Sequence, residues 1–102
     1  MNKEFIPYEQ ILEIKTLGFD GILWQEAFRW FRDKRGLYST IEIDQTMEPM
    51  FCYSLSRYNG NYQWDNILPT YSELYYTYEE AELACLKKLI EIAKNDTDRR
   101  DI

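Results

Sequence analysis

The stretch TYEEAELACLKKLIEIAK, residues 77–94, decides the expected fold because its start signal and its apolar period are both clear. Thr77 followed three residues later by Glu80 is a capping box, in which the threonine hydroxyl accepts a hydrogen bond from the Glu80 amide. At about 100° per residue, one side of the predicted helix is apolar. That side carries Tyr78, Ala81, Cys85, Leu89, Ile92 and Ala93, with Leu86 and Ile90 at its margins. Such a helix must cover another surface, and we expect that surface to be a β-sheet.

Two further helices are predicted before the sheet. The first covers residues 7–17 and ends at Gly18, which supplies the left-handed residue of a helix C-terminus. Its apolar period consists of Tyr8, Ile11, Leu12, Ile14 and Leu17. The second covers residues 20–35, with Asp20 as its N-cap. Its buried side is expected to be aromatic and consists of Trp24, Ala27, Phe28 and Phe31.

After the second helix the apolar period changes from a helical one to two, which is typical of strands. The pattern predicts strands over residues 37–43 and 50–58. Asn59-Gly60 is the strongest hairpin signal in the chain, because both residues tolerate the positive φ of a type I′ turn. A third strand over residues 61–65 should fold back on the second.

Residues 71–76 form either a fourth short strand or an extended approach to the last helix, and both alternatives stay open. The predicted fold class is α+β: a small antiparallel sheet of three or four strands, covered on one face by helices, in the order α-α-β-β-β-(β)-α. We expect one α+β domain over residues 1–95 and a flexible tail over residues 96–102.

The composition is that of one soluble globular domain, with 102 residues, 45% hydrophobic and 29% charged. No apolar run approaches the roughly 18 to 20 residues that span a bilayer, and the first residues do not resemble a secretory signal. A cytoplasmic location is therefore expected, without a membrane partner. Cys52 and Cys85 are expected to be two reduced, buried thiols rather than a disulfide or a metal site.

The formal net charge of −6 disfavours nucleic acid as a partner, since sequence-independent phosphate binding requires an excess of Lys and Arg. One local basic excess is more simply a solvated helix face than a phosphate site. It consists of Arg29, Arg32, Lys34 and Arg35.

The chain has no histidine, and hence lacks the commonest general base and the commonest transition-metal ligand. We predict no catalytic residues, no cofactor and no metal site. Four carboxylates near the strands are the one set that could gather a divalent ion, although solubility of the sheet explains them more simply. They are Glu42, Asp44, Glu48 and Asp65.

Aromatic residues make up 17% of the chain, a high share for a small domain. The tyrosines on and after the hairpin could form a surface that docks a partner protein or a second copy of the chain. These candidates are Tyr58, Tyr62, Tyr71, Tyr75 and Tyr76. The alternative is that these rings suit half-buried strands, and we favour that alternative for Trp64. Alanine at both Tyr75 and Tyr76 is expected to leave folding intact and to weaken association.

The order of a helix, three strands and a helix from Trp24 onward resembles the topology of double-stranded-RNA-binding domains. That family grips phosphates with lysines at the start of its last helix. This chain has Glu79, Glu80 and Glu82 there, so the resemblance implies a fold and not an RNA-binding function.

Three segments resemble small uncharacterised proteins that recur in phages and prophages of gut Bacteroidetes. They are FIPYEQILEIKTLGFD, WQEAFRWFRDKRGLYSTIEI and YYTYEEAELACLKKLIEI. The resemblance implies a bacterial cytoplasmic setting and a mobile-element origin, and it brings no catalytic or binding residues.

The leading hypothesis from the sequence is a non-enzymatic, protein-binding domain of phage or prophage origin, whose partner is an unknown protein or a second copy of the chain. One alternative is an acidic mimic of nucleic acid that occupies a DNA-binding protein, for which the net charge is the argument. A hydrolase with a carboxylate-bound metal is the weakest alternative.

Overall fold

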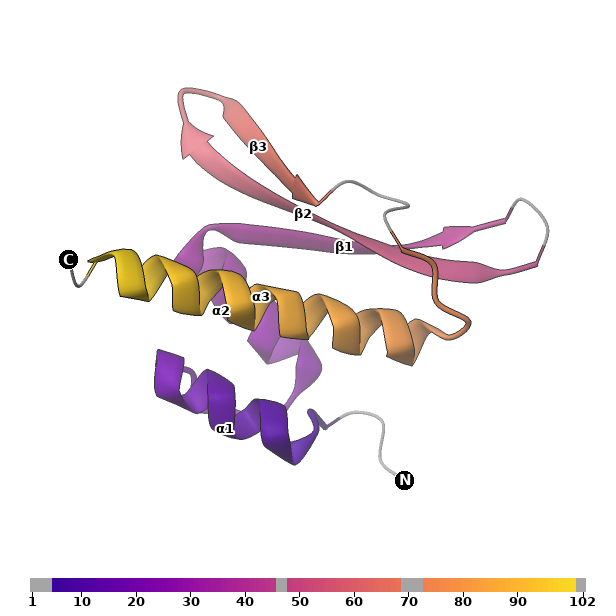
Figure 1. The fold of residues 1–102 in the computed structure, drawn as a ribbon, viewed down its shortest axis with the longest axis horizontal. Helices are drawn as coiled ribbons and strands as arrows, with labels where there is room; N and C mark the ends of the chain where they lie inside the picture. Colours follow the sequence, from indigo (N-terminus) through magenta and orange to yellow (C-terminus); the bar gives the residue numbers. More distant parts are fainter. Residues whose placement is uncertain (1–4, 46–47, 69–72, 101–102) are drawn as a thin grey trace.

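The computed structural model describes residues 5–45, 48–68 and 73–100. The elements in this part of the chain are α1 (Tyr8–Leu17), α2 (Trp24–Arg35), β1 (Leu37–Asp44), β2 (Met50–Gly60), β3 (Gln63–Leu68) and α3 (Tyr78–Arg100). The predicted α+β class and its element order are confirmed. Figure 1 shows the sheet on one side of the molecule, α2 and α3 beneath it, and α1 furthest from the sheet. None of the described helices is long and apolar enough to cross a membrane.

Helix α3 forms the centre of the core, as the sequence predicts. The Glu80 amide donates to the Thr77 hydroxyl at 3.1 Å, which is the predicted cap. The side chains that α3 buries are Ala81, Cys85, Leu86, Leu89, Ile90 and Ala93. They meet residues of β1, β2, α1 and α2. The helix also continues past its predicted end at residue 94, and Asp96, predicted to lie in the tail, instead pairs with Arg57 of β2 at 2.5 Å.

Helix α2 packs on β1 through the aromatic face that the sequence predicts, with Trp24, Ala27 and Phe31 buried. It starts later than expected, however. Its N-cap is Leu23, which makes no side-chain cap, and not Asp20. The backbone just before the helix is occupied by the N-terminal lead, because the Ile6 amide donates to the Ile22 carbonyl at 2.8 Å.

The first helix buries a narrower strip than its apolar period predicts. Ile14 and Gln10 are buried, whereas Tyr8 and Leu12 are exposed. The reason is its place in the outermost layer, where α1 packs on α3 and leaves its other sides in water. Arg35, expected to be part of a solvated face, also holds this layer, since its guanidinium donates to the Leu17 carbonyl at 3.0 Å.

The three described strands form one antiparallel sheet with β2 in the middle. Strand β1 pairs with β2 along its whole length, from Leu37 opposite Arg57 to Asp44 opposite Met50. The described helices all lie on one side of this sheet, as Figure 1 shows, and none of them packs on the opposite face.

The β2–β3 turn lies two residues later than predicted. Positive φ occurs at Asn61 (54°) and Tyr62 (61°), so these two residues, and not Asn59-Gly60, form the turn. The observed register pairs Tyr58 with Trp64 and Arg57 with Asp65. A turn at Asn59-Gly60 would replace these aromatic and oppositely charged pairs, which outweigh the local turn preference.

The described part of the segment before α3 is an extended approach to the helix and not a fourth strand. A single bridge joins it to the sheet, in which Tyr75 and Phe51 exchange two backbone hydrogen bonds of 2.7 Å. Residues 71 and 72, the start of the predicted strand, lie outside the described residues.

Candidate functional site

The face of the sheet that points away from the helices can be identified residue by residue along β1. Leu37 belongs to the core, and the Ser39 hydroxyl donates to the Cys85 sulfur of α3. Because side chains alternate between the two faces of a strand, Tyr38, Thr40 and Glu42 project from the opposite face. We call this side of the sheet the open face.

Three aromatic rings meet on the open face. The Trp64 ring lies edge-on to Tyr38, with centroids 4.9 Å apart and planes at 77°, and its centroid is 5.0 Å from that of Tyr58. Tyr38 and Trp64 come from strands that do not pair with each other. They can touch because Ser56 of β2, which lies opposite Tyr38, is too small to separate them.

Tyr62 extends this group at the tip of the hairpin. Its backbone amide donates to the Tyr58 hydroxyl at 3.1 Å, while its own side chain is 94% exposed and makes no ring contact with another described residue. We define the aromatic surface as Tyr38, Tyr58, Tyr62 and Trp64. Each of these side chains is at least a third exposed, and together they reach from the start of β1 to the end of the hairpin.

The side chains beside the aromatic surface on the open face are neutral or acidic. Beside it on the open face, the Thr40 and Ser54 hydroxyls bond to each other at 2.7 Å. Glu42 and Asp44 follow along β1. Among the side chains that the structure describes on this face there is no lysine or arginine, because Arg57 points to the other side and pairs with Asp96. The surface therefore offers rings, hydroxyls and carboxylates.

The predicted interface residues that the structure describes lie in three environments. Tyr58 and Tyr62 belong to the aromatic surface, and Tyr76 is 75% exposed without contacting it. Tyr71 lies outside the described residues. Tyr75 is partly buried and packs against the core.

Tyr75 has the contacts of a packing residue. Its ring stacks on Tyr53 with centroids 6.3 Å apart, and its hydroxyl donates to the Glu73 carboxylate. Burial, and then this hydrogen bond, raise the pKa of the Tyr75 hydroxyl. These contacts favour a loss of stability when Tyr75 is replaced by alanine, because the substitution removes a ring packed on buried Tyr53.

Neither a known protein family, a curated protein nor a solved structure matches the chain. Its function is therefore inferred from its own geometry.

Sequence reasoning missed two members of the aromatic surface. Trp64, predicted to be a half-buried strand residue, is 52% exposed, and Tyr38 is not among the predicted interface residues. The alternation along β1 already separates Tyr38 from core residue Leu37, so that signal was present. Trp64 could be placed on the open face only with the correct hairpin register, which depends on the position of the turn.

The carboxylates considered for a metal site are not brought together. Glu42 and Asp44 lie on β1, whereas Asp65 lies on β3 opposite Arg57. Within residues 5–45, 48–68 and 73–100 no group of three or more cysteine, aspartate or glutamate side chains is arranged to hold a metal ion.

Both cysteines are buried, as predicted. Cys85 lies in the core, where burial raises the pKa of its thiol to about 12. The hydrogen bond from Ser39 lowers this pKa, and the charge of Glu82 raises it further. The thiolate, which is the reactive form, is hence scarce at neutral pH.

Proposed function

We propose that this chain is a non-enzymatic protein-binding domain and that the aromatic surface is its contact with the partner. The observation that carries the proposal is the group of exposed rings around Trp64, on a sheet face that no described helix covers. The resemblance to phage and prophage proteins supports a setting in the cytoplasm of a bacterial host.

Exposed Trp and Tyr side chains supply large contact areas at a small loss of side-chain entropy, and they dominate the binding energy of many protein interfaces. The rings of Tyr38, Tyr58 and Trp64 are already ordered by one another. A partner that covers them would therefore lose little free energy in fixing their rotamers.

The conformation of Tyr62 supports the same proposal. Its φ of 61° is left-handed, a region that a bulky residue adopts at a cost of about 1–2 kcal/mol. Glycine would avoid this cost, and the exposed ring gives the fold no packing in return. A ring that the fold does not need is available for a partner.

The chemistry of the open face favours a protein over nucleic acid as the partner. Stacking platforms for single-stranded nucleic acid combine aromatic rings with cations that follow the phosphates. The described part of the open face carries Glu42 and Asp44 beside the rings, and the cations Arg29 and Arg32 of α2 border one ring only, that of Tyr38. We infer that the partner presents apolar groups to the rings and basic side chains to Glu42 and to the acidic chain as a whole.

A mimic of nucleic acid is less well supported, because several carboxylates are paired within the chain itself. Glu13 binds Lys94, Asp96 binds Arg57, Glu91 binds Lys88 and Asp33 binds Arg32. A carboxylate that is already paired is a poor substitute for a backbone phosphate.

The proposal can be tested by selecting peptides from a random display library on the immobilised protein. We expect enrichment of sequences that combine Arg or Lys with Leu, Phe or Trp, and loss of their binding in Trp64→Ala. Tyr76→Ala is the matched control, since it removes an aromatic ring that is even more exposed but lies outside the aromatic surface.

Sedimentation of the wild type and Trp64→Ala distinguishes a second copy of the chain as the partner. Self-association that disappears in Trp64→Ala would identify the same surface as a homodimer contact and would contradict the basic partner. A selection without enrichment, or one whose peptides bind Trp64→Ala as well as the wild type, would overturn the proposal.

A further inference from the structure

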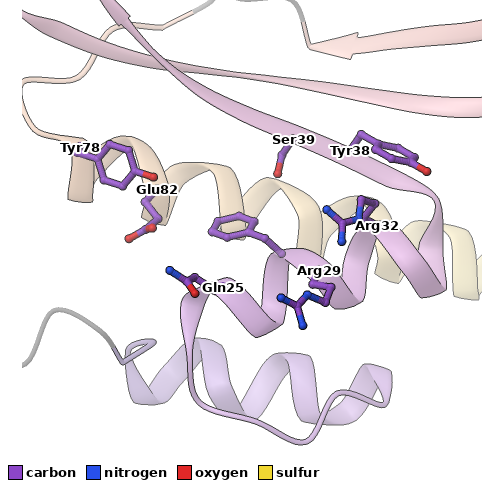
Figure 2. A pocket seen from close by; sticks show the side chains of 8 residues that line it. Gln25, Arg29, Arg32, Tyr38, Ser39, Tyr78 and Glu82 are labelled. Carbon is purple, nitrogen blue, oxygen red and sulfur yellow. The ribbon is translucent and has the colours of Figure 1, made fainter.

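A groove that meets the aromatic surface only at Tyr38 lies between α2, β1 and the first turns of α3 (Figure 2). Its volume is about 440 Å³, which is within the range of small-molecule sites. The side chains that line it are Gln25, Phe28, Arg29 and Arg32 of α2, Tyr38 and Ser39 of β1, and Tyr78 and Glu82 of α3. It therefore combines aromatic walls with charges of both signs.

One end of the groove is cationic. Arg29 and Arg32 are three residues apart and so project from the same side of α2. In the described part of the chain, Arg29 forms no ion pair. Arg32 uses its Nε to bind Asp33 Oδ1 at 3.2 Å, which leaves its two terminal nitrogens without a carboxylate among the described residues. Two guanidinium groups with free donors are a suitable site for a carboxylate or a phosphate.

The other end is acidic. Figure 2 shows Glu82 and Tyr78 apart from the two arginines, at the α3 side of the groove. Among the described residues, Glu82 makes no hydrogen bond and no ion pair. Burial, and then the charge of Glu79, raise the pKa of Glu82 to about 7, and no cation lies close enough to lower it. This carboxylate is therefore partly desolvated and lacks a counter-charge.

We propose that the groove binds a small dipolar molecule, with an oxyanion held by Arg29 and Arg32, an ammonium group paired with Glu82, and an apolar ring between them. A ligand with both charges fits the groove better than a simple anion, because an anion would bind the arginines and leave Glu82 without a partner. The ring would lie along Phe28 and Tyr78, two aromatic side chains that line the groove.

The charges that face Glu82 determine how binding depends on pH. Glu79, Tyr78 and Cys85 come from α3 itself, Arg29 and Arg32 lie across the groove on α2, and β1 contributes Tyr38. The raised pKa of Glu82, about 7, makes its carboxyl change charge near neutral pH. A ligand ammonium requires the ionised carboxylate, so affinity for a dipolar ligand should rise with pH, whereas affinity for an anion should fall.

The test uses three probes of one shape: 4-(aminomethyl)benzoate, which carries both charges, 4-methylbenzoate and 4-methylbenzylamine. Binding to the full chain is measured by NMR titration of the arginine Nε–H groups and the backbone amides of α2 and α3. We expect the dipolar probe to bind at least about fivefold more tightly than either of the two singly charged probes. Its affinity should rise by up to about tenfold from about pH 6 to about pH 8, the change in the ionised fraction of a group with a pKa of about 7.

Matched variants assign the two ends. Arg29→Gln should weaken both the dipolar probe and 4-methylbenzoate, whereas Lys34→Gln, with the same change of charge on the same helix outside the groove, should weaken neither. Glu82→Gln should abolish the preference for the dipolar probe and its pH dependence. Glu80→Gln, on the same turn of α3 but outside the groove, should leave both unchanged.

Equal affinity for the dipolar probe and 4-methylbenzoate would overturn the proposal, as would an unchanged preference in Glu82→Gln. Signals that shift around Trp64 instead of α2 and α3 would also overturn it, because they would place the ring on the aromatic surface.

Discussion

The rings of Tyr38 and Trp64 meet edge to face, 4.9 Å apart, although their strands lie on either side of β2 and do not pair. The contact joins the first strand of the sheet to the last across the small side chain of Ser56. It thus orders the open face from β1 to β3, which none of the described helices covers.

This contact should be measurable as a coupling between the two side chains. In a double-mutant cycle of Tyr38→Ala and Trp64→Ala, we expect a coupling free energy of about 0.5–1.5 kcal/mol in urea unfolding. A cycle of Tyr38→Ala with Tyr76→Ala serves as the control and should give no coupling, since Tyr76 does not contact the aromatic surface. Additive effects of Tyr38 and Trp64 would show that the ring contact does not stabilise the open face.

A second prediction concerns the burial of the two leucines that the sequence placed on helix faces. Leu89 of α3 is fully buried and Leu12 of α1 is 48% exposed. Leu89→Ala should lower the free energy of unfolding by about 2–5 kcal/mol, because it removes apolar contacts and leaves a cavity. Leu12→Ala should lower it by less than about 1 kcal/mol. Chemical denaturation followed by circular dichroism measures both, and similar losses would contradict the layer order in which α1 is outermost.

The contrast between these helices shows what the sequence could predict. The apolar face of α3 is wide and is covered on several sides, so its period alone identified Leu86, Leu89 and Ala93 as core. The period of α1 was equally clear, but a helix in an outer layer is covered along one strip only. Which side of α1 meets α3 depends on how the layers are stacked, and this information is not local to residues 7–17.

The hairpin shows the same limit for the candidate site. Local turn preference favoured Asn59-Gly60, whereas cross-strand pairing of Tyr58 with Trp64 decided the register. A shift in register changes which residues face the helices and which face solvent. The sequence could therefore predict an aromatic surface that includes Tyr58 and Tyr62. The position of Trp64 on that surface could not be predicted without the register of the β2–β3 hairpin.

The third prediction is that stability depends on pH through the carboxyl group of Glu82. Its pKa is raised from the ordinary 4.5 to about 7, chiefly by burial, so the folded state binds the proton more tightly than the unfolded state. Below pH 4.5 the carboxyl is protonated in both states and has no effect. Between pH 4.5 and about 7 only the folded state keeps the proton, so stability falls as the pH rises, and above about 7 the folded state carries the unfavourable, partly buried charge.

Glu82→Gln should remove this loss. The variant should match the wild type near pH 4.5 and exceed it by about 1 kcal/mol near pH 8, after allowance for the partial exposure of the side chain to water. Urea unfolding at the two pH values measures the difference, with Glu80→Gln, an exposed carboxylate on the same turn, as control. If the difference in stability between Glu82→Gln and the wild type does not change with pH, Glu82 is not the source of the loss of stability at higher pH.

The left-handed residue Tyr62 allows stability and binding to be changed in opposite directions. Glycine adopts a φ of 61° without steric strain, so Tyr62→Gly should raise the free energy of unfolding by about 0.5–1 kcal/mol, even after the greater freedom of glycine in the unfolded chain. The same change removes the most exposed ring of the aromatic surface, and it should weaken binding of the selected basic peptides. Tyr62→Asn is the matched variant, since asparagine also tolerates this conformation and lacks the ring. A gain in stability together with unchanged peptide binding would show that Tyr62 is not part of the contact, and a loss of stability would show that the Tyr62 ring supports the hairpin itself.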